Sequence, residues 1–265
     1  HVYVAAATGS AVVVFTRNTT TGALAWHSTV TNSSPGVSGM GGARAVAVSP
    51  DGRHVVVAGE TSDGIAVFAR NLATGALTFV EAKLDGANEG LNGASALAFS
   101  PAGDALYVAG FEDDAVVVFS RNLTAGQLAP QLSWSERETD GAGLPLADGL
   151  DGARGVEVSP DGSLVFVAGA NDGKIAIFSR NTGGAQVHKL DFLDIAGLTS
   201  AVDLAISPAG EQVYGVGDVA DLLGMFSETR GASCPVPGGS VLAFSQSAVI
   251  PAQSYVAYTA AAVLE

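Results

Sequence analysis

The chain has 265 residues, with 12 basic and 26 acidic side chains and a formal charge of −14. This balance argues against nucleic acid and anionic membrane as partners, because both recruit Lys and Arg to phosphate groups. No apolar run approaches the ~18 residues of a membrane-spanning helix, which argues against membrane insertion by a helix. The single Cys234 excludes an internal disulfide.

The first predicted elements form an incomplete repeat unit. Apolar runs at His1–Ala5 and Ala11–Phe15 are followed by Gly22–His27, and they match the second, third and fourth strands of the later units. The innermost strand of this first unit is absent. The chain also opens at His1 without a Met, which we interpret as a sign of processing or trimming from a longer precursor.

A block of about fifty residues then recurs, and this period is typical of repeat architectures. Each block has four short apolar runs separated by Ser-Pro-Asp-Gly or Thr-Gly turns, the pattern of a four-stranded antiparallel meander. Both faces of such a sheet are apolar and need cover from like neighbours, which radial packing into a β-propeller supplies. The blocks begin at Ala43, Ala94, Ala153 and Ala201, and the Phe anchors that count five units are Phe15, Phe68, Phe119, Phe178 and Phe226.

The tail after residue 231 offers two further strands, Ser240–Val249 and Ser254–Leu264. The first completes the last blade and the second completes the first blade, so that no sheet edge is left open. We therefore predict an all-β, five-bladed β-propeller of four-stranded antiparallel blades, closed by pairing of the N- and C-terminal strands. It is a single domain over 1–265, with repeats in 1–231 and closing strands in 232–265. Alternatively, the tail begins a truncated β-sandwich module like those of bacterial surface proteins.

The strings Ser49-Pro-Asp-Gly52, Ala66-Val-Phe-Ala-Arg-Asn71 and Thr74-Gly-Ala-Leu77, with their repeats, resemble the lactonase-like, YVTN-type β-propellers of bacteria. The resemblance covers residues 1 to about 230. It implies a propeller fold, usually of seven blades, and a family that includes 6-phosphogluconolactonase-like enzymes and many extracellular proteins.

Two acids interrupt the innermost strands where the repeat has Ala. Glu157 and Asp203 are expected near the central channel, with Arg44 and Arg154 as their partners and as ligand-binding groups. Carboxylates beside Arg can serve as acid and base in lactone hydrolysis. They can equally form a buried ion pair or contact channel water.

The loops of one face are strongly acidic, which predicts a negative mouth for a cationic ligand or protein partner. Calcium requires several converging oxygen ligands, and we take Asp113, Asp114, Asp148 and Asp151 as its candidates. The alternative is that these Asp side chains cap local amides in turns. We predict no required cofactor, with calcium as an optional ion at these residues.

These observations favour a secreted or surface-exposed propeller that acts as a binding or scaffold module. The alternatives are a lactone hydrolase that uses Glu157 and Asp203, and a subunit of an extracellular assembly that self-associates through its terminal strands.

Overall fold

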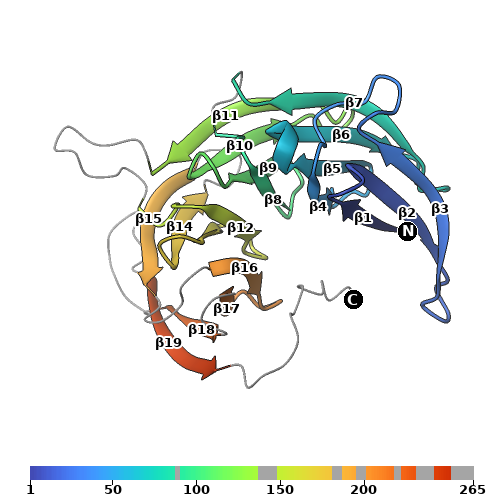
Figure 1. Ribbon diagram of the computed structural model, residues 1–265. Coiled ribbons are helices and arrows are strands. Elements are labelled where there is room, and N and C mark those ends of the chain that lie inside the picture. The colour runs from blue at the N-terminus through green and yellow to red at the C-terminus, as the bar shows by residue number, and fades with distance from the viewer. Residues whose placement is uncertain are drawn as a thin grey trace.

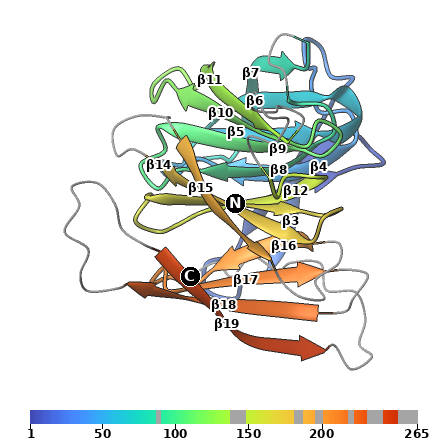
Figure 2. The same ribbon diagram turned by 90° about the vertical axis from the view of Figure 1, so that its left-hand side faces the viewer.

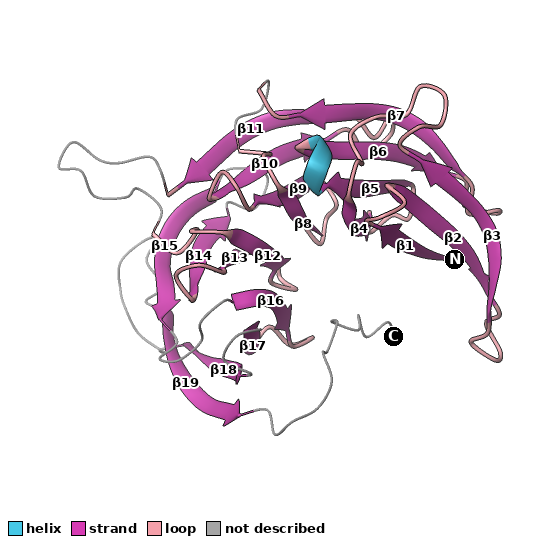
Figure 3. Ribbon diagram, in the orientation of Figure 1, coloured by secondary structure: helices cyan, strands magenta, loops and turns pink. Residues whose placement is uncertain are grey.

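The computed structural model describes residues 1–86, 90–136, 148–180, 187–194, 201–217, 222–230 and 242–251. Within these residues nineteen strands form five antiparallel sheets, and apart from the short 3-10 helix η1 (Glu60–Ser62) every described element is a strand (Figure 3). No helix in the described ranges is long or apolar enough to cross a membrane. The predicted all-β class is confirmed.

We number the five sheets as blades one to five in chain order. Each is a meander in which neighbouring strands pair in sequence order. Blade one has three described strands, one fewer than the others, as the incomplete first repeat predicts. The strands are β1 (Val2–Ala6), β2 (Ala11–Arg17) and β3 (Leu24–Thr31) in blade one; β4 (Ala43–Val48), β5 (His54–Gly59), β6 (Gly64–Arg70) and β7 (Leu77–Leu84) in blade two; β8 (Ala94–Phe99), β9 (Ala105–Gly110), β10 (Ala115–Arg121) and β11 (Leu128–Ser135) in blade three; β12 (Ala153–Val158), β13 (Leu164–Gly169), β14 (Lys174–Arg180) and β15 (Val187–Asp194) in blade four; and β16 (Ala201–Ile206), β17 (Gln212–Gly217), β18 (Leu222–Arg230) and β19 (Leu242–Pro251) in blade five.

The blades follow one another around a common centre (Figure 1). Strands β4, β8, β12 and β16 lie on the inside of this arc, and β7, β11, β15 and β19 lie on its rim. The turned view shows blade five as a separate layer beyond blade four (Figure 2). The inner strands of neighbouring blades therefore line the middle of the molecule.

The outer strand predicted at Ser240–Val249 is confirmed, because β19 pairs antiparallel with β18 over Leu242–Pro251. The arc of described strands is open between blade five and blade one (Figure 1). The second closing strand, Ser254–Leu264, falls outside the described residues, as does the alternative of a β-sandwich module in the tail. Five-bladed closure therefore stays a prediction.

The repeated Ser-Pro-x-Gly segments form the tight turns between the first two strands of blades two to five. In blade two the Ser49 amide donates to the His54 carbonyl at 2.9 Å, and the Ser49 hydroxyl donates to Asp51 Oδ1 at 2.6 Å. Gly52 has φ 69, a left-handed conformation that glycine adopts without steric cost. This local chemistry is why the turns can be recognised from sequence.

The Phe anchors fill the seams between consecutive blades. Phe68, Phe119 and Phe178 are fully buried, each against apolar residues of the preceding blade. The same face of blade one has no described blade in front of it. Val4, Leu24 and Trp26 on that face are 43%, 52% and 67% exposed.

Candidate functional site

The two inner strands β12 and β16 lie side by side and carry the acids that break the repeat. Glu157 is the residue before the last of β12 and lies opposite Phe166 of β13, which belongs to the apolar cluster between blades four and five. Asp203 lies on β16 opposite Val216 of β17. The structure thus places Glu157 and Asp203 on adjacent channel-side strands, as the sequence predicted.

The two carboxylates share one electrostatic environment. Burial first, and the nearby charge of Asp203 second, raise the pKa of Glu157 to about 7, while an amide hydrogen bond opposes the shift. Burial also raises the pKa of Asp203, although its Oδ1 accepts a hydrogen bond from the Leu204 amide at 2.9 Å. A carboxyl group that titrates near neutrality can both accept and donate a proton in this pH range.

Gly155 allows this close approach of the two strands. A Cβ at this position would lie only 3.2 Å from the Asp203 Cα and 3.4 Å from the Ala168 Cβ, tighter than ordinary van der Waals contact. The sequence reasoning did not single out Gly155. The signal was nevertheless present, because blades two and three have Ala45 and Ala96 at this place in the repeat.

The expected pairing of the two acids with Arg44 and Arg154 is corrected by the structure. The Arg44 guanidinium instead forms an ion pair with Glu60 at 3.3 Å. Arg154 lies over the ring of Phe111, with its guanidinium carbon 4.5 Å from the ring centroid. Both arginines lie near the first residue of their strands, whereas Glu157 lies further along β12. The arginines and Glu157 are therefore separated along the strand direction, although their places in the repeat had suggested a partnership.

The predicted calcium ligands mostly bind groups of the protein itself. Asp113 accepts from the Asn92 amide at 3.0 Å, Asp114 accepts from the Gly152 amide at 2.9 Å, and Asp151 accepts from the Asn171 side chain at 2.8 Å. Each of these bonds ties an inter-blade loop to the turn between the second and third strands of blade three or blade four. They correspond to the alternative interpretation, in which the Asp side chains cap local amides.

Asp148 alone among the four belongs to a convergent group of acids in the described residues. Its oxygen lies within 4.8 Å of ligand atoms from Glu136 and Asp172, two residues that the sequence reasoning did not select as ligands. Burial is the main cause that raises the pKa of Asp172 to about 6. The Lys174 ammonium already neutralises part of this group, since it is 2.6 Å from Asp148 Oδ1. Calcium binding stays a prediction.

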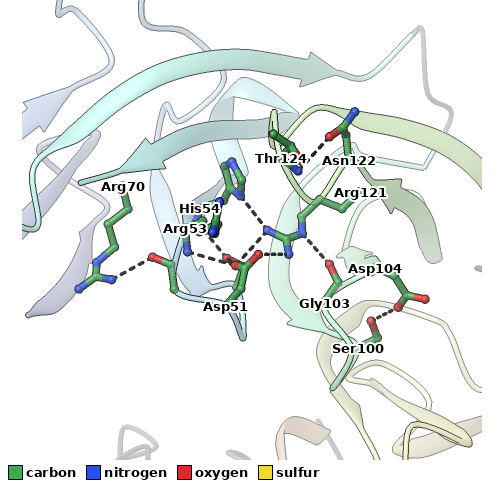
Figure 4. Close-up of polar contacts among 12 residues, drawn as sticks. Asp51, Arg53, His54, Arg70, Ser100, Gly103, Asp104, Arg121, Asn122 and Thr124 are labelled. Carbon is green, nitrogen blue, oxygen red and sulfur yellow. Dashed lines mark hydrogen bonds and ion pairs between the residues drawn. The ribbon is translucent and has the colours of Figure 1, made fainter. Parts of the chain in front are cut away.

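A further set of charged residues joins the blades. Arg121 of blade three donates to Asp51 of blade two at 2.9 Å and contacts the His54 Nδ1 at 2.7 Å (Figure 4). Arg180 of blade four donates in the same way to Asp104 of blade three at 2.6 Å. These bridges were not predicted from the sequence, although their signal is the Arg two residues after each of the first four Phe anchors.

Antiparallel meander sheets that follow one another around a common centre are the architecture of a β-propeller. The profile of the family "Lactonase, 7-bladed beta-propeller" matches residues 1–136, and the chain belongs to this family. The family resemblance inferred from the repeats is confirmed. None of the curated proteins matches the chain.

Solved structures with a similar fold include a protein provisionally named 6-phosphogluconolactonase from Bacteroides fragilis, with 18% identity and a TM-score of 0.71 over 93% of this chain. A protein from Lactobacillus plantarum has 20% identity and a TM-score of 0.70 over 94% of the chain and 68% of its own length. The periplasmic gluconolactonase PpgL of Pseudomonas aeruginosa has 20% identity and a TM-score of 0.65 over 91% of the chain and 63% of its own length. The chain spans about two thirds of such proteins, 66% for the Bacteroides structure, and at these identities the likeness shows the fold alone.

Proposed function

We propose that the chain is a lactone hydrolase in which Glu157 acts as general base and Asp203 tunes it. The observation that carries this proposal is the electrostatic coupling of the two acids, with the pKa of Glu157 at about 7. An ordinary Glu, with a pKa near 4.5, is a weak base at neutral pH. A pKa close to the working pH combines a useful ionised fraction with useful basicity.

In the proposed reaction the Glu157 carboxylate takes a proton from water as the water oxygen bonds to the lactone carbonyl carbon. The tetrahedral intermediate then breaks its bond to the ring oxygen. Glu157 returns the proton to this leaving oxygen, and the product is a hydroxy acid. Water is the only co-reactant, and the carboxyl group is regenerated. Asp203 is a positioning residue: burial is the main cause of the raised pKa of Glu157, and the charge of Asp203 adds to it.

Two comparisons support this substrate class. The chain belongs to the lactonase family, and two structures of similar fold carry the names 6-phosphogluconolactonase, given provisionally, and gluconolactonase. The periplasmic origin stated for PpgL also agrees with our proposal that this chain works outside the cytoplasm.

Turnover of D-glucono-δ-lactone and a panel of simple γ- and δ-lactones tests the proposal after subtraction of spontaneous hydrolysis. Glu157→Gln should lower kcat by at least ~100-fold, the usual contribution of a general base. Glu211→Gln is the matched control, because Glu211 is an exposed acid on the turn that follows β16. Full activity in Glu157→Gln, or no turnover of any lactone by the wild-type protein, refutes the proposed function.

A second proposal is that the chain acts as a binding or assembly module, and the uncovered face of blade one favours it. The repeat counterparts of Val4 and Leu24 are Val57 and Leu77, which pack in the seam between blades one and two. A sheet face of this kind is suited to contact another apolar sheet. Leu24→Ser/Trp26→Ser should reduce concentration-dependent association in light scattering, whereas Leu123→Ser, at an equally exposed leucine outside this face, should not. A monomer at all concentrations would argue against this role.

A further inference from the structure

One arginine near the start of an inner strand has no carboxylate partner among the described residues. Arg44 and Arg154 occupy the same place at the start of the inner strands of blades two and four. The residue that follows the second strand also occupies the same place in blades two, three and four, because its amide donates to the carbonyl of the glycine just before the inner strand. The three pairs are Glu60 with Gly42, Phe111 with Gly93, and Ala170 with Gly152. Arg44 pairs with Glu60 of its own blade, whereas blade four has Ala170 at that position.

Arg154 turns instead toward blade three. Its guanidinium carbon is 4.5 Å from the centroid of the Phe111 ring. Its Nε is shielded from solvent and has no hydrogen-bond partner among the described residues. A buried donor with no partner is costly, and such groups are normally satisfied by water or by a ligand. Phe111 therefore holds the guanidinium without consuming its hydrogen-bond donors.

The acids nearest in sequence do not neutralise Arg154. Asp151 accepts from the Asn171 side chain, and Asp114 accepts from the Gly152 amide. Each bond joins the loop that leads into β12 to a turn of blade three or blade four. Among the described residues, no carboxylate therefore takes up the donors of Arg154, at the start of the strand that carries Glu157.

We propose that Arg154, supported by Phe111, binds the carboxylate of a hydroxy acid. A guanidinium donates two parallel hydrogen bonds to a carboxylate, and an aromatic ring beneath it fixes the guanidinium plane. Arg154 and Glu157 lie on the same inner strand but face different neighbours, since Arg154 contacts Phe111 of blade three and Glu157 lies opposite Phe166, which packs toward blade five. The choice of ligand rests on the proposed function, since ring opening of a lactone produces this class of compound.

Calorimetric titration with sodium gluconate, at constant ionic strength and with sorbitol as the neutral control, tests this site. We expect gluconate to bind and sorbitol not to bind. Arg154→Gln should weaken the binding of gluconate by at least ~10-fold, and Arg44→Gln should leave it unchanged because Arg44 is already paired. Phe111→Ala should also weaken binding, whereas Phe111→Tyr should retain it.

Arg154→Lys serves as the second variant and retains the positive charge but not the planar fork, so it should bind gluconate more weakly than wild type. Thermal melting establishes that each variant is folded. No gluconate binding by the wild-type protein up to ~50 mM, or equal loss in Arg44→Gln and Arg154→Gln, overturns the inference. Binding is measured without turnover, so gluconate binding that depends on Arg154, in a protein without lactonase activity, would refute the proposed hydrolase and leave this site standing.

Discussion

Arg121 of blade three reaches across the seam to Asp51 of blade two, with 2.9 Å between Nη2 and Oδ2. The guanidinium is almost completely buried and also bonds to the Gly103 carbonyl of its own blade and to the ring of His54. Although burial opposes it, hydrogen bonds from Arg121 and Ser49 hold the pKa of Asp51 well below its usual range. One arginine therefore links two consecutive sheets through residues that are 70 positions apart in the sequence (Figure 4).

Removal of this link should destabilise the protein. Arg121→Gln leaves the buried part of Asp51 and His54 without a cationic donor, and we expect a loss of roughly 3 kcal/mol in the free energy of unfolding by urea. Arg53→Gln is the control, because Arg53 lies in the same turn as Asp51 but is exposed, with no ion pair among the described residues. Equal stability of the two variants would show that the bridge contributes nothing.

The same seam should make the fold sensitive to acid. Burial first, and the charge of Arg121 second, lower the pKa of His54 in the folded state, with a smaller opposing effect from Asp51 and a further lowering by Arg53. Stability is therefore fully present above pH ~6.5, the pKa of an unfolded His, and declines as the pH falls toward the lower folded-state value. His54→Gln should flatten the melting temperature between pH 6.5 and 5. An unchanged pH dependence in this variant would contradict this assignment.

Glu157 should give stability the opposite pH dependence to that of His54. Its folded-state pKa of about 7 is above the unfolded value, so its contribution is fully present below pH ~4.5 and is lost as the pH rises through 7. Glu157→Gln removes the cost of ionising this group and should stabilise the protein at pH 8 by up to roughly 3 kcal/mol. The two proteins should be much closer at pH 5. A variant that is less stable than wild type at pH 8 would show that the ionised carboxylate is well solvated.

Ring closure predicts a specific contact between blade five and blade one. Arg17 corresponds to Arg121 in the repeat, and Glu211 of blade five corresponds to Asp104, the acid that pairs with Arg180. If blade five covers blade one, Arg17 and Glu211 should form the next inter-blade bridge. Arg17→Glu should then lower the melting temperature, and the double variant Arg17→Glu/Glu211→Arg should recover it. Truncation after residue 251 should also lower the melting temperature, and indifference to all three changes would exclude closure in this form.

The repeat made much of the fold predictable. The Ser-Pro-x-Gly turns, the Phe anchors and the Asn71 side chain that accepts from the Ala73 and Thr74 amides are all set within a few residues. Glu157 and Asp203 could be found because each departs from an otherwise constant position.

Other features depend on how neighbouring blades approach each other. The bridge from Arg121 to Asp51, the placement of Phe111 under Arg154, and the contribution of Glu136 to the acidic group all join different blades or loops. The repeat spacing alone does not encode the angle between two sheets. For the same reason it predicted five units but could not establish whether those units close a ring.

The pH dependence of kcat/KM for D-glucono-δ-lactone, in wild type and Asp203→Asn, tests the central claim most directly. The account predicts that activity rises with pH through a midpoint near 7 in the wild-type protein. Loss of the Asp203 charge should move this midpoint to lower pH, because the repulsion that raises the pKa of Glu157 is removed. A midpoint that is the same in both proteins would contradict the claim that Asp203 tunes Glu157 as the general base.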